Sequence, residues 1–223
     1  KCIALLDDNP VTGGQIWRTG VAAPAQPQAD SLRAQLAAAS NVELFTGTRV
    51  IAHTGHHELL LENALHSWRI GYEQLIFCTG AREVLLPFPG WTLPGVTGAG
   101  GLQALIKGGM PVRDERIVIA GSGPLLLASA ASAKAAGGRV VRIAEQASSA
   151  ALARFALHLP RWPGKLRQAA QLFDASYRAN SQVVEALGDR HLEAVRVRQG
   201  GAEVEIPCER LACGYGLRAN TEL

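Results

Sequence analysis

A glycine-rich hexapeptide in the second half of the chain has the residue types and spacing best suited to binding a ligand. Residues 121–126 read GSGPLL and come directly after a run of apolar residues typical of a buried strand. In G-x-G-x-x-G the first glycine makes a tight turn, the second lets the backbone approach a pyrophosphate, and the third permits close helix–strand packing. Leu126 takes the place of the third glycine. We expect Gly121, Gly123 and Pro124 to lie against a diphosphate at a helix N-terminus, where the helix dipole favours anions.

An acid follows at the distance that this chemistry requires. Glu145 ends the next predicted strand, where a carboxylate accepts hydrogen bonds from the ribose hydroxyls of NAD and repels the 2′-phosphate of NADP. NAD is therefore favoured, although Arg139 and Arg142 on the same strand argue in the other direction. Strand, glycines, helix, strand and acid in this order predict a Rossmann-type nucleotide site. The alternative is a Rossmann unit that no longer binds a ligand, and Leu126 is the argument for it.

A second acid closes the apolar run at the start of the sequence. Residues 3–7 read IALLD, which predicts a buried parallel strand ending at Asp7. An apolar strand that ends in an acid is typical of the second strand of the same kind of unit, whose glycine loop would lie on the order of 20–25 residues upstream. We therefore expect the later part of one dinucleotide unit and most of a second one.

The elements between and after these motifs follow from periodicity and turn residues. A helix is predicted over 31–39, and residues 74–78 are predicted to be a buried strand that stops at 79–81. Three short runs between them, at 49–52, 58–61 and 67–70, favour an antiparallel meander. Beyond the glycine loop we predict helices near 148–158 and 164–179 and strands at 182–187, 191–198, 202–206 and 210–213.

Composition and charge exclude several function classes. The chain has 223 residues, 48% of them hydrophobic, which is enough for a sizeable core. Its net charge is only +3 and its basic residues are scattered, so nothing supports nucleic-acid binding. No apolar stretch is long enough to span a membrane, and we expect a cytoplasmic protein, with a peripheral position at the inner membrane face as the alternative.

The cysteines and histidines do not suggest a metal site or a redox disulfide. No C-x-x-C and no H-E-x-x-H spacing occurs, and no metal is predicted. The four cysteines are Cys2, Cys78, Cys208 and Cys213. Cys208 and Cys213 lie beside a predicted strand and are interpreted as buried small hydrophobic residues.

At several positions the sequence resembles the pyridine-nucleotide-disulfide-oxidoreductase-like flavoproteins. Residues 7–18 are similar to the segment after a strand in that family, and residues 78–81 read CTGA where the family usually has ATGA. Residues 86–101 (LPFPGWTLPGVTGAGG), together with 121–127 and 211–217, resemble one branch of it. That branch holds the FAD/NAD(P)-binding subunits of hydrogen cyanide synthase, opine oxidase and dye-linked proline dehydrogenase. The resemblance covers nearly the whole chain.

The resemblance implies FAD and NAD(P) as cofactors and assigns residues to each. Asp7 would hold the adenosine ribose of FAD, and the backbone at 79–81 would pass close to its diphosphate. The residues implied for FAD are Asp7, Gly13, Gly14, Gln15, Thr79, Gly80 and Ala81, and those for the second nucleotide are Gly121, Gly123, Pro124 and Glu145.

The predicted fold class is therefore α/β, with two Rossmann-like dinucleotide-binding domains. The NAD(P)-type domain is inserted in a truncated FAD-type one. A Pro- and Gly-rich stretch marks the first boundary, which gives a first FAD-binding part at 1–112, an NAD(P)-binding-like domain at 113–207 and a return to the FAD-binding domain at 208–223. Because the family's first glycine loop is missing from the sequence, we expect this fragment to bind FAD poorly and to be inactive by itself.

The implied function is that of an FAD-dependent oxidoreductase subunit of the amino-acid, opine or amine dehydrogenase or oxidase type. The small amine or amino-acid substrate would be oxidised on a second flavoprotein subunit, with electrons passed through flavin. Two alternatives stay open: an NAD(P)H-dependent flavin reductase of the ferredoxin or rubredoxin reductase kind, and a non-catalytic scaffold that docks the substrate-oxidising subunit. No catalytic residue is predicted, and Arg82 and Glu83, beside the flavin strand, are interpreted as a surface turn.

Overall fold

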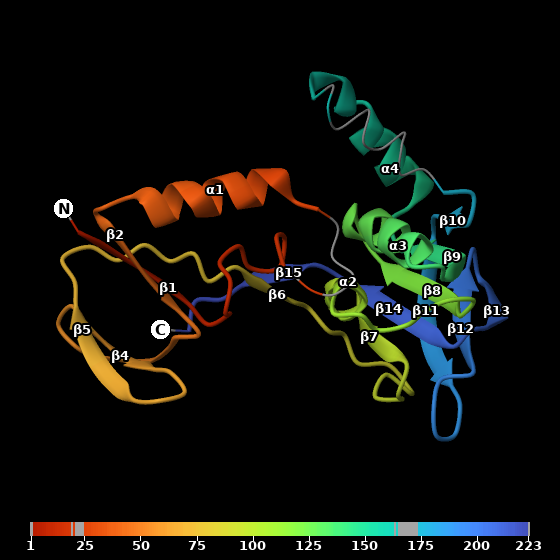
Figure 1. Cartoon of the computed structure of the whole chain (residues 1–223). Coiled ribbons are helices and arrows are strands. Elements are labelled where there is room, and N and C mark those ends of the chain that lie inside the picture. Colours follow the sequence, from red (N-terminus) through yellow and green to blue (C-terminus); the bar gives the residue numbers. More distant parts are fainter. Residues whose placement is uncertain (1, 19, 21–24, 163, 165–173, 223) are drawn as a thin grey trace. The chain divides into compact units, whose positions relative to one another are not determined.

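The computed structural model describes residues 2–18, 20, 25–162, 164 and 174–222. They belong to two compact units (Figure 1), unit 1 comprising Lys1–Ala81 with Ala219–Leu223 and unit 2 comprising Arg82–Arg218. The borders of the two units, after residues 81 and 218, are not those of the domains predicted from the sequence, which lie after residues 112 and 207. The domain division stays a prediction. Each unit is described by itself.

Unit 1 combines a parallel strand pair with an antiparallel meander. Strands β1 (Ile3–Asp7) and β2 (Val42–Thr46) pair in parallel, and the chain between them contains helix α1 (Pro27–Ala38). A parallel pair needs such a crossover, and a helix is the usual one. The predicted meander is confirmed as β3 (Arg49–Gly55), β4 (Glu58–Glu62) and β5 (Ser67–Gly71).

Two runs that were predicted to be buried strands are largely exposed. In β1 the side chain of Ile3 is 50% exposed, and at 74–78 no strand forms, with Ile76 83% and Phe77 56% exposed. Among the described residues β1 pairs with β2 alone and the 74–78 segment pairs with no strand. The prediction of burial was therefore wrong because an apolar pattern shows what a segment can bury and not whether a neighbour covers it.

Unit 2 is built on a five-stranded, fully parallel sheet. Its strand order is β10-β9-β8-β14-β7, so that β8 lies at the centre with β9 and β10 to one side of it. This is the arrangement of a dinucleotide-binding sheet around its first strand. The strands are β7 (Val96–Gly98), β8 (Arg116–Gly121), β9 (Arg139–Glu145), β10 (Tyr177–Arg178) and β14 (Arg210–Gly214).

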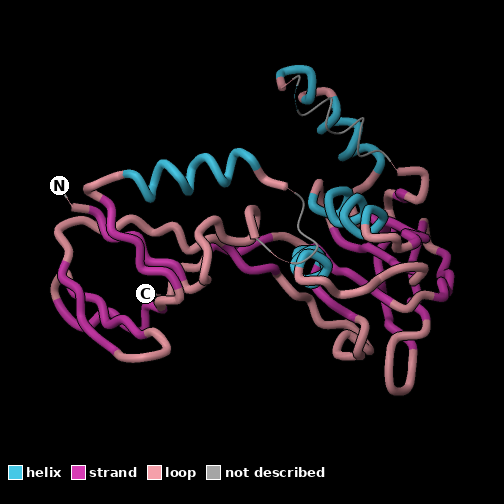
Figure 2. Tube along the Cα trace, viewed as in Figure 1, coloured by secondary structure: helices cyan, strands magenta, loops and turns pink. Residues whose placement is uncertain are grey.

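Other elements cover both faces of this sheet (Figure 1, Figure 2). Helices α2 (Ala99–Lys107) and α3 (Leu125–Ala135) pack on one face, and on the other lies a meander of β11 (Ser181–Leu187), β12 (Ala194–Gln199) and β13 (Ala202–Pro207). Two buried clusters result, one on each face. Burial on both faces explains why β8 is apolar from Ile117 onward rather than alternating.

Among the remaining elements, one predicted helix is confirmed and another prediction is partly wrong. The predicted helix near 148–158 is confirmed as α4 (Ser149–Ala156), which Ser148 caps by accepting the N–H of Ala151, and a 3-10 helix follows at Leu159–Arg161. Of the predicted helix at 164–179, residues 165–173 lie outside the described part, and its end is the strand β10. Two short strands, β6 (Ala81–Glu83) and β15 (Leu217–Ala219), form a separate pair.

Candidate functional site

The glycine loop of unit 2 uses its two glycines for different purposes. Both have positive φ angles, +141° at Gly121 and +96° at Gly123. A Cβ on Gly121 would lie 2.0 Å from the carbonyl oxygen of Gly214, at the end of β14, whereas a Cβ on Gly123 would meet nothing within 4 Å. Gly121 is therefore required for packing, and Gly123 leaves the open surface that a ligand could approach.

Leu126, at the position of the third glycine, lies in the core. Its side chain is fully buried, and a Cβ on Gly214 would lie 3.1 Å from its Cδ2 atom. The small residue that lets helix and sheet approach is thus on the strand, at Gly214, and not on the helix. The side chain of Leu126 therefore does not cover the surface of the glycine loop. Sequence reasoning missed Gly214, although it lies in the 211–217 motif.

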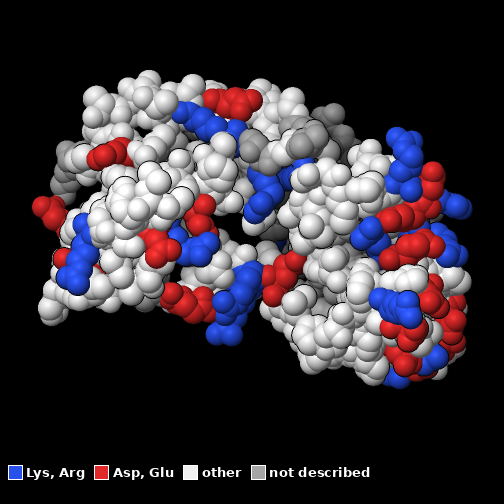
Figure 3. Space-filling view, turned by 60° about the horizontal axis from the view of Figure 1, so that its bottom comes forward, with Lys and Arg blue, Asp and Glu red and all other residues white. Residues whose placement is uncertain are grey.

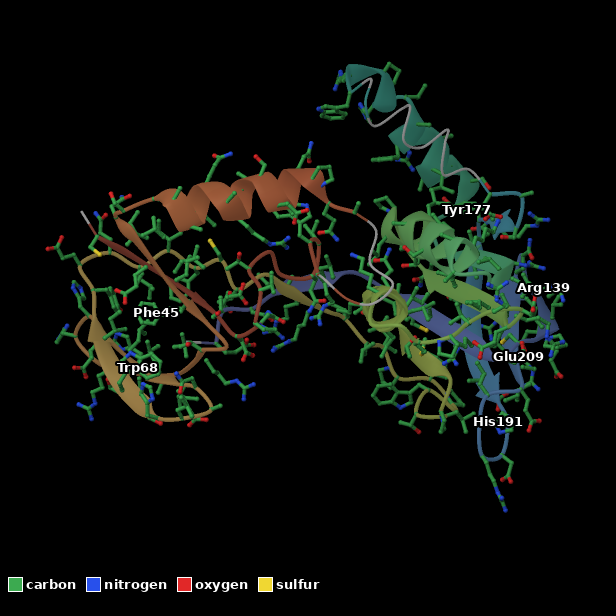
Figure 4. All side chains as sticks on the ribbon, in the orientation of Figure 1. Phe45, Trp68, Arg139, Tyr177, His191 and Glu209 are labelled. Carbon is green, nitrogen blue, oxygen red and sulfur yellow. The ribbon has the colours of Figure 1, made fainter. Side chains whose placement is uncertain are left out.

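The carboxylate of Glu145 is enclosed by three donors. Its side chain is 1% exposed, and its oxygens accept the N–H of Gly123 (2.9 Å), the N–H of Ala147 (2.8 Å) and the hydroxyl of Tyr177 (3.0 Å). Burial, followed by the charge of Glu145, raises the pKa of Tyr177 above its ordinary value, so the hydroxyl stays protonated and donates. Tyr177 (labelled in Figure 4) was missed because it falls within the helix predicted over 164–179.

The two arginines of β9 are placed away from this carboxylate or engaged elsewhere. Arg139 is at the other end of β9 (Figure 4), and the strand's rise of roughly 3.3 Å per residue puts its backbone about 20 Å from that of Glu145. Arg142 donates to the side-chain oxygen of Gln199 on β12, at 2.7 Å. Burial and the neighbouring Arg178 lower the pKa of Arg142.

In unit 1, Asp7 lies at the end of β1 and orders the loop that follows. Its Oδ1 atom accepts both the backbone N–H and the side-chain N–H of Asn9, each at 2.9 Å. The side chain is partly buried rather than enclosed. Because both bonds end on Oδ1, Oδ2 is the oxygen that is left, within the described residues, for a ribose hydroxyl.

The loop after Asp7 is held by helix α1. Arg33 donates to the carbonyl oxygens of Thr12 and Trp17, both at 2.9 Å, and so brackets the two glycines between them. Gly13 and Gly14 both turn through positive φ. The side-chain oxygen of Gln15 accepts from Arg18 at 3.0 Å. These contacts fix the backbone on which the resemblance places the flavin nucleotide.

Thr79 and Gly80 are clamped by a residue from the end of the described chain. The hydroxyl of Thr79 donates to the carbonyl oxygen of Asn220 at 2.6 Å, and the amide of the Asn220 side chain donates back to the carbonyl of Thr79 at 2.9 Å. The N–H of Asn220 donates to the carbonyl of Gly80 at 3.1 Å. Ala81 then begins β6. Sequence reasoning had no signal for Asn220, because it lies far along the chain and contacts only the backbone and one hydroxyl.

Glu83 is not part of a surface turn, as the sequence suggested, but caps a helix. Its carboxylate accepts the N–H groups of Gly100 (2.8 Å) and Gly101 (2.9 Å) in the first turn of α2. A Cβ on Gly98 would lie 2.1 Å from one of these carboxylate oxygens, which explains why small residues begin this helix. The contact satisfies two helix N–H groups and places a negative charge at the positive end of the helix dipole.

The cysteines divide into an exposed pair and a buried pair, as predicted for the latter. Cys208 and Cys213 are buried in unit 2, and burial raises the pKa of each thiol to about 12. Cys2 and Cys78 are exposed.

This difference predicts which thiols of the native protein react. Two thiols per chain are expected to react with a disulfide reagent at pH 8, and all four in denaturant, because a thiol with a pKa near 12 holds almost no thiolate at that pH. Ellman titration with and without urea counts them. Reaction of three or four thiols without denaturant would show that the core of unit 2 opens readily.

Three further features of the described residues concern metal ligands, apolar helices and surface charge. No group of three or more His, Cys, Asp or Glu side chains in this part of the chain could hold a metal ion. None of the described helices is long and apolar enough to cross a membrane. On the face shown in Figure 3, acidic and basic side chains are intermixed rather than gathered by sign.

Comparison with proteins of known sequence and structure places these features in a family. Residues 3–223 match the model of the pyridine nucleotide-disulphide oxidoreductases. Hydrogen cyanide synthase subunit HcnB of Pseudomonas aeruginosa is 32% identical, over 98% of this chain and 52% of its own length. An opine oxidase subunit of Rhizobium meliloti is 30% identical, over 86% of this chain and 45% of its own length. The chain thus spans about half the length of these relatives.

Solved structures agree on the fold. Thioredoxin reductase of Lactococcus lactis matches with a TM-score of 0.66 and 16% identity, over 99% of this chain and 79% of that one. L-proline dehydrogenase from P. horikoshii matches with a TM-score of 0.57 and 16% identity, over 97% of this chain and 37% of that one. These likenesses confirm the predicted α/β fold with Rossmann-like dinucleotide-binding architecture. The chain belongs to the pyridine nucleotide-disulphide oxidoreductase family of FAD- and NAD(P)-dependent oxidoreductases.

Proposed function

We propose that this chain is the FAD-binding part of an oxidoreductase subunit that receives electrons from an amine or amino acid oxidised on a partner subunit. Both relatives compared above are named as subunits, one of hydrogen cyanide synthase and one of opine oxidase. The family membership supports the redox chemistry, and these names favour a multi-subunit assembly with an amino-acid or opine type of substrate.

The observation that carries the proposal is the state of the acid at the end of β1. Asp7 is partly buried, its Oδ1 atom is fixed by Asn9, and its carboxylate stands at the carboxyl end of a parallel strand, where dinucleotide-binding sheets bind the ribose. We assign the FAD adenosine ribose to Asp7, the flanking nucleotide to Gly13, Gly14 and Gln15, and the diphosphate to the backbone at Thr79, Gly80 and Ala81.

The residues named here fit the group. Gly80 has open space where a Cβ would stand, and so does Gly14, which allows a close approach to either backbone. When bound, FAD supplies the hydride-accepting chemistry. The contribution of this chain is to bind and orient: the clamp from Asn220 fixes the Thr79–Gly80 backbone, and Arg33 fixes the loop after Asp7.

Asp7→Asn is expected to weaken FAD binding about tenfold, because the amide keeps the shape of Asp7 but loses a charge-assisted hydrogen bond worth roughly 1.5–3 kcal/mol. Asp8→Asn is the matched control: its carboxylate is exposed and pairs with Arg49 at 3.4 Å, so the affinity for FAD should not change. Titration of the chain with FAD, followed by flavin fluorescence, measures both. Equal affinities for the two variants would remove Asp7 from the site.

The source of the electrons is tested on the complex. The full-length subunit that contains this sequence, loaded with FAD and combined with its partner subunit, is mixed anaerobically with amino acids and opines and, separately, with NADH, while flavin absorbance is recorded. We expect bleaching by an amine substrate only when the partner is present. Rapid bleaching by NADH without the partner, and none by amines, would overturn the proposal in favour of an NAD(P)H-dependent flavin reductase.

The proposal also includes a preference between the two nicotinamide nucleotides. For any dinucleotide that reached the glycine loop of unit 2, the negative charge of Glu145 would favour NAD over NADP, because it repels the 2′-phosphate of NADP.

A further inference from the structure

We propose that Tyr177 closes the ribose position of the unit 2 dinucleotide site, so that this chain does not bind NADH or NADPH as it is folded. The inference concerns a different site from the proposed FAD-binding residues and does not depend on them. It is a disagreement with what the family implies, and it rests on the surroundings of Glu145.

The acid of a dinucleotide site has to present its oxygens to the two ribose hydroxyls. In unit 2 the oxygens of Glu145 are already used. Oε1 accepts the N–H of Ala147, and Oε2 accepts both the N–H of Gly123 and the hydroxyl of Tyr177. A Tyr hydroxyl at 3.0 Å from a carboxylate makes the same kind of contact as a ribose hydroxyl would make. With only 1% of Glu145 exposed, a ribose cannot reach the carboxylate unless the Tyr177 side chain first leaves.

The diphosphate position is also affected. The N–H of Gly123 is a donor that the glycine loop would turn toward a pyrophosphate, and here it donates to Glu145 at 2.9 Å. Pro124 has no N–H to offer in its place. The loop of unit 2 thus has the backbone shape of a phosphate-binding turn while its acid holds one of the donors.

Tyr177 is held in this position by its own strand and by packing. Its backbone belongs to β10 and pairs in parallel with Ile143 of β9. Its side chain packs against the buried cluster between the sheet and helices α2 and α3, which includes Leu126 and Ile143. If the Tyr177 ring left this position, it would expose apolar surface and the Glu145 carboxylate would lose one of its three hydrogen-bond donors. Both costs oppose the opening of the ribose position by a weakly bound ligand.

The experiment is a titration of the 223-residue chain with NADH, and separately with NADPH, followed by nicotinamide fluorescence and by calorimetry. Tyr177→Phe removes the hydroxyl and keeps the ring, and Tyr177→Ala removes both. We expect no saturable binding to the unmodified chain at millimolar nucleotide, and at least a tenfold gain in NADH affinity for Tyr177→Ala, with a smaller gain for Tyr177→Phe. Tyr72→Phe, which removes a hydroxyl bound to His53 in unit 1, is the matched control and should give no gain.

Three results would overturn the inference. Tight binding of NADH to the unmodified chain would show that the ribose position is open. Weaker binding to the Tyr177 variants than to the unmodified chain would make Tyr177 part of a working nucleotide site. No binding to any variant, with thermal melting curves showing that each is folded, would mean that something other than Tyr177 closes the site. The assay uses neither FAD nor the partner subunit, so its failure is distinguishable from failure of the proposed function.

Discussion

Gly121→Ala is expected to destabilise unit 2 by about 4 kcal/mol or more, which is a large part of the roughly 5–15 kcal/mol that stabilises a typical domain. The added Cβ would lie 2.0 Å from the carbonyl oxygen of Gly214 and 2.4 Å from its carbonyl carbon, both of which are backbone atoms. They cannot move away as a side chain could, because β14 is paired with strands on both sides. The φ angle of +141° adds a conformational cost for any residue with a Cβ.

Gly123→Ala is the matched control from the same loop. It also has a positive φ angle, but its Cβ would meet nothing, so only the backbone term remains, about 1–2 kcal/mol. Urea denaturation followed by circular dichroism compares the two variants, and hydrogen exchange at residues 116–145 assigns the loss to unit 2. Equal destabilisation of the two variants would show that the contact with Gly214 is not what makes Gly121 necessary.

The sequence predicted what local order can encode. The succession of apolar run, glycines, helix, apolar run and acid identified β8, α3 and β9, and the acid at the end of β9 does contact the second glycine. These residues are close in sequence and belong to one supersecondary unit, so their types and spacing determine the arrangement.

What the sequence did not predict depends on contacts between distant segments. Gly214 takes over the role of a third glycine because β14 lies beside β8, and Asn220 clamps Thr79 because the chain returns to unit 1. Glu83 caps α2 through N–H groups that lie seventeen and eighteen residues further along the chain. In each case an ordinary residue type has a defined position only through tertiary structure, and periodicity contains no information on which strands become neighbours.

The exposed apolar residues at 74–78 show that a local pattern can also predict burial that the tertiary structure does not provide. Ile76 and Phe77 fit the pattern of a buried strand, yet a strand needs a partner for its backbone groups, and none is supplied by the described residues. The prediction was about a property of the segment, whereas burial is a property of the segment and its neighbours.

Glu145→Ala is expected to be the second large effect, a loss of about 3–5 kcal/mol in the free energy of unfolding of unit 2. The change leaves the N–H groups of Gly123 and Ala147 and the hydroxyl of Tyr177 without an acceptor at a position that is 1% exposed. These donors are partly buried, and each one left without an acceptor costs up to roughly 1–3 kcal/mol, to which the cavity adds. The exposed acid Glu203, which pairs with Arg198 on the surface, gives the control: Glu203→Ala should cost about 1 kcal/mol or less.

The series is completed by two milder changes that separate charge from hydrogen bonding. Tyr177→Phe removes one of the three donors and leaves Glu145 bonded to two N–H groups, so it should cost about 1 kcal/mol. Glu145→Gln keeps the shape of the side chain but replaces one of its two accepting oxygens by an NH2 group, which then faces a donor instead of accepting from it. We expect an intermediate loss of about 2 kcal/mol in the free energy of unfolding. Urea denaturation of the four variants gives the order Glu203→Ala and Tyr177→Phe, then Glu145→Gln, then Glu145→Ala. A stable Glu145→Ala protein would contradict the enclosed carboxylate, and with it the basis on which Tyr177 closes the ribose position.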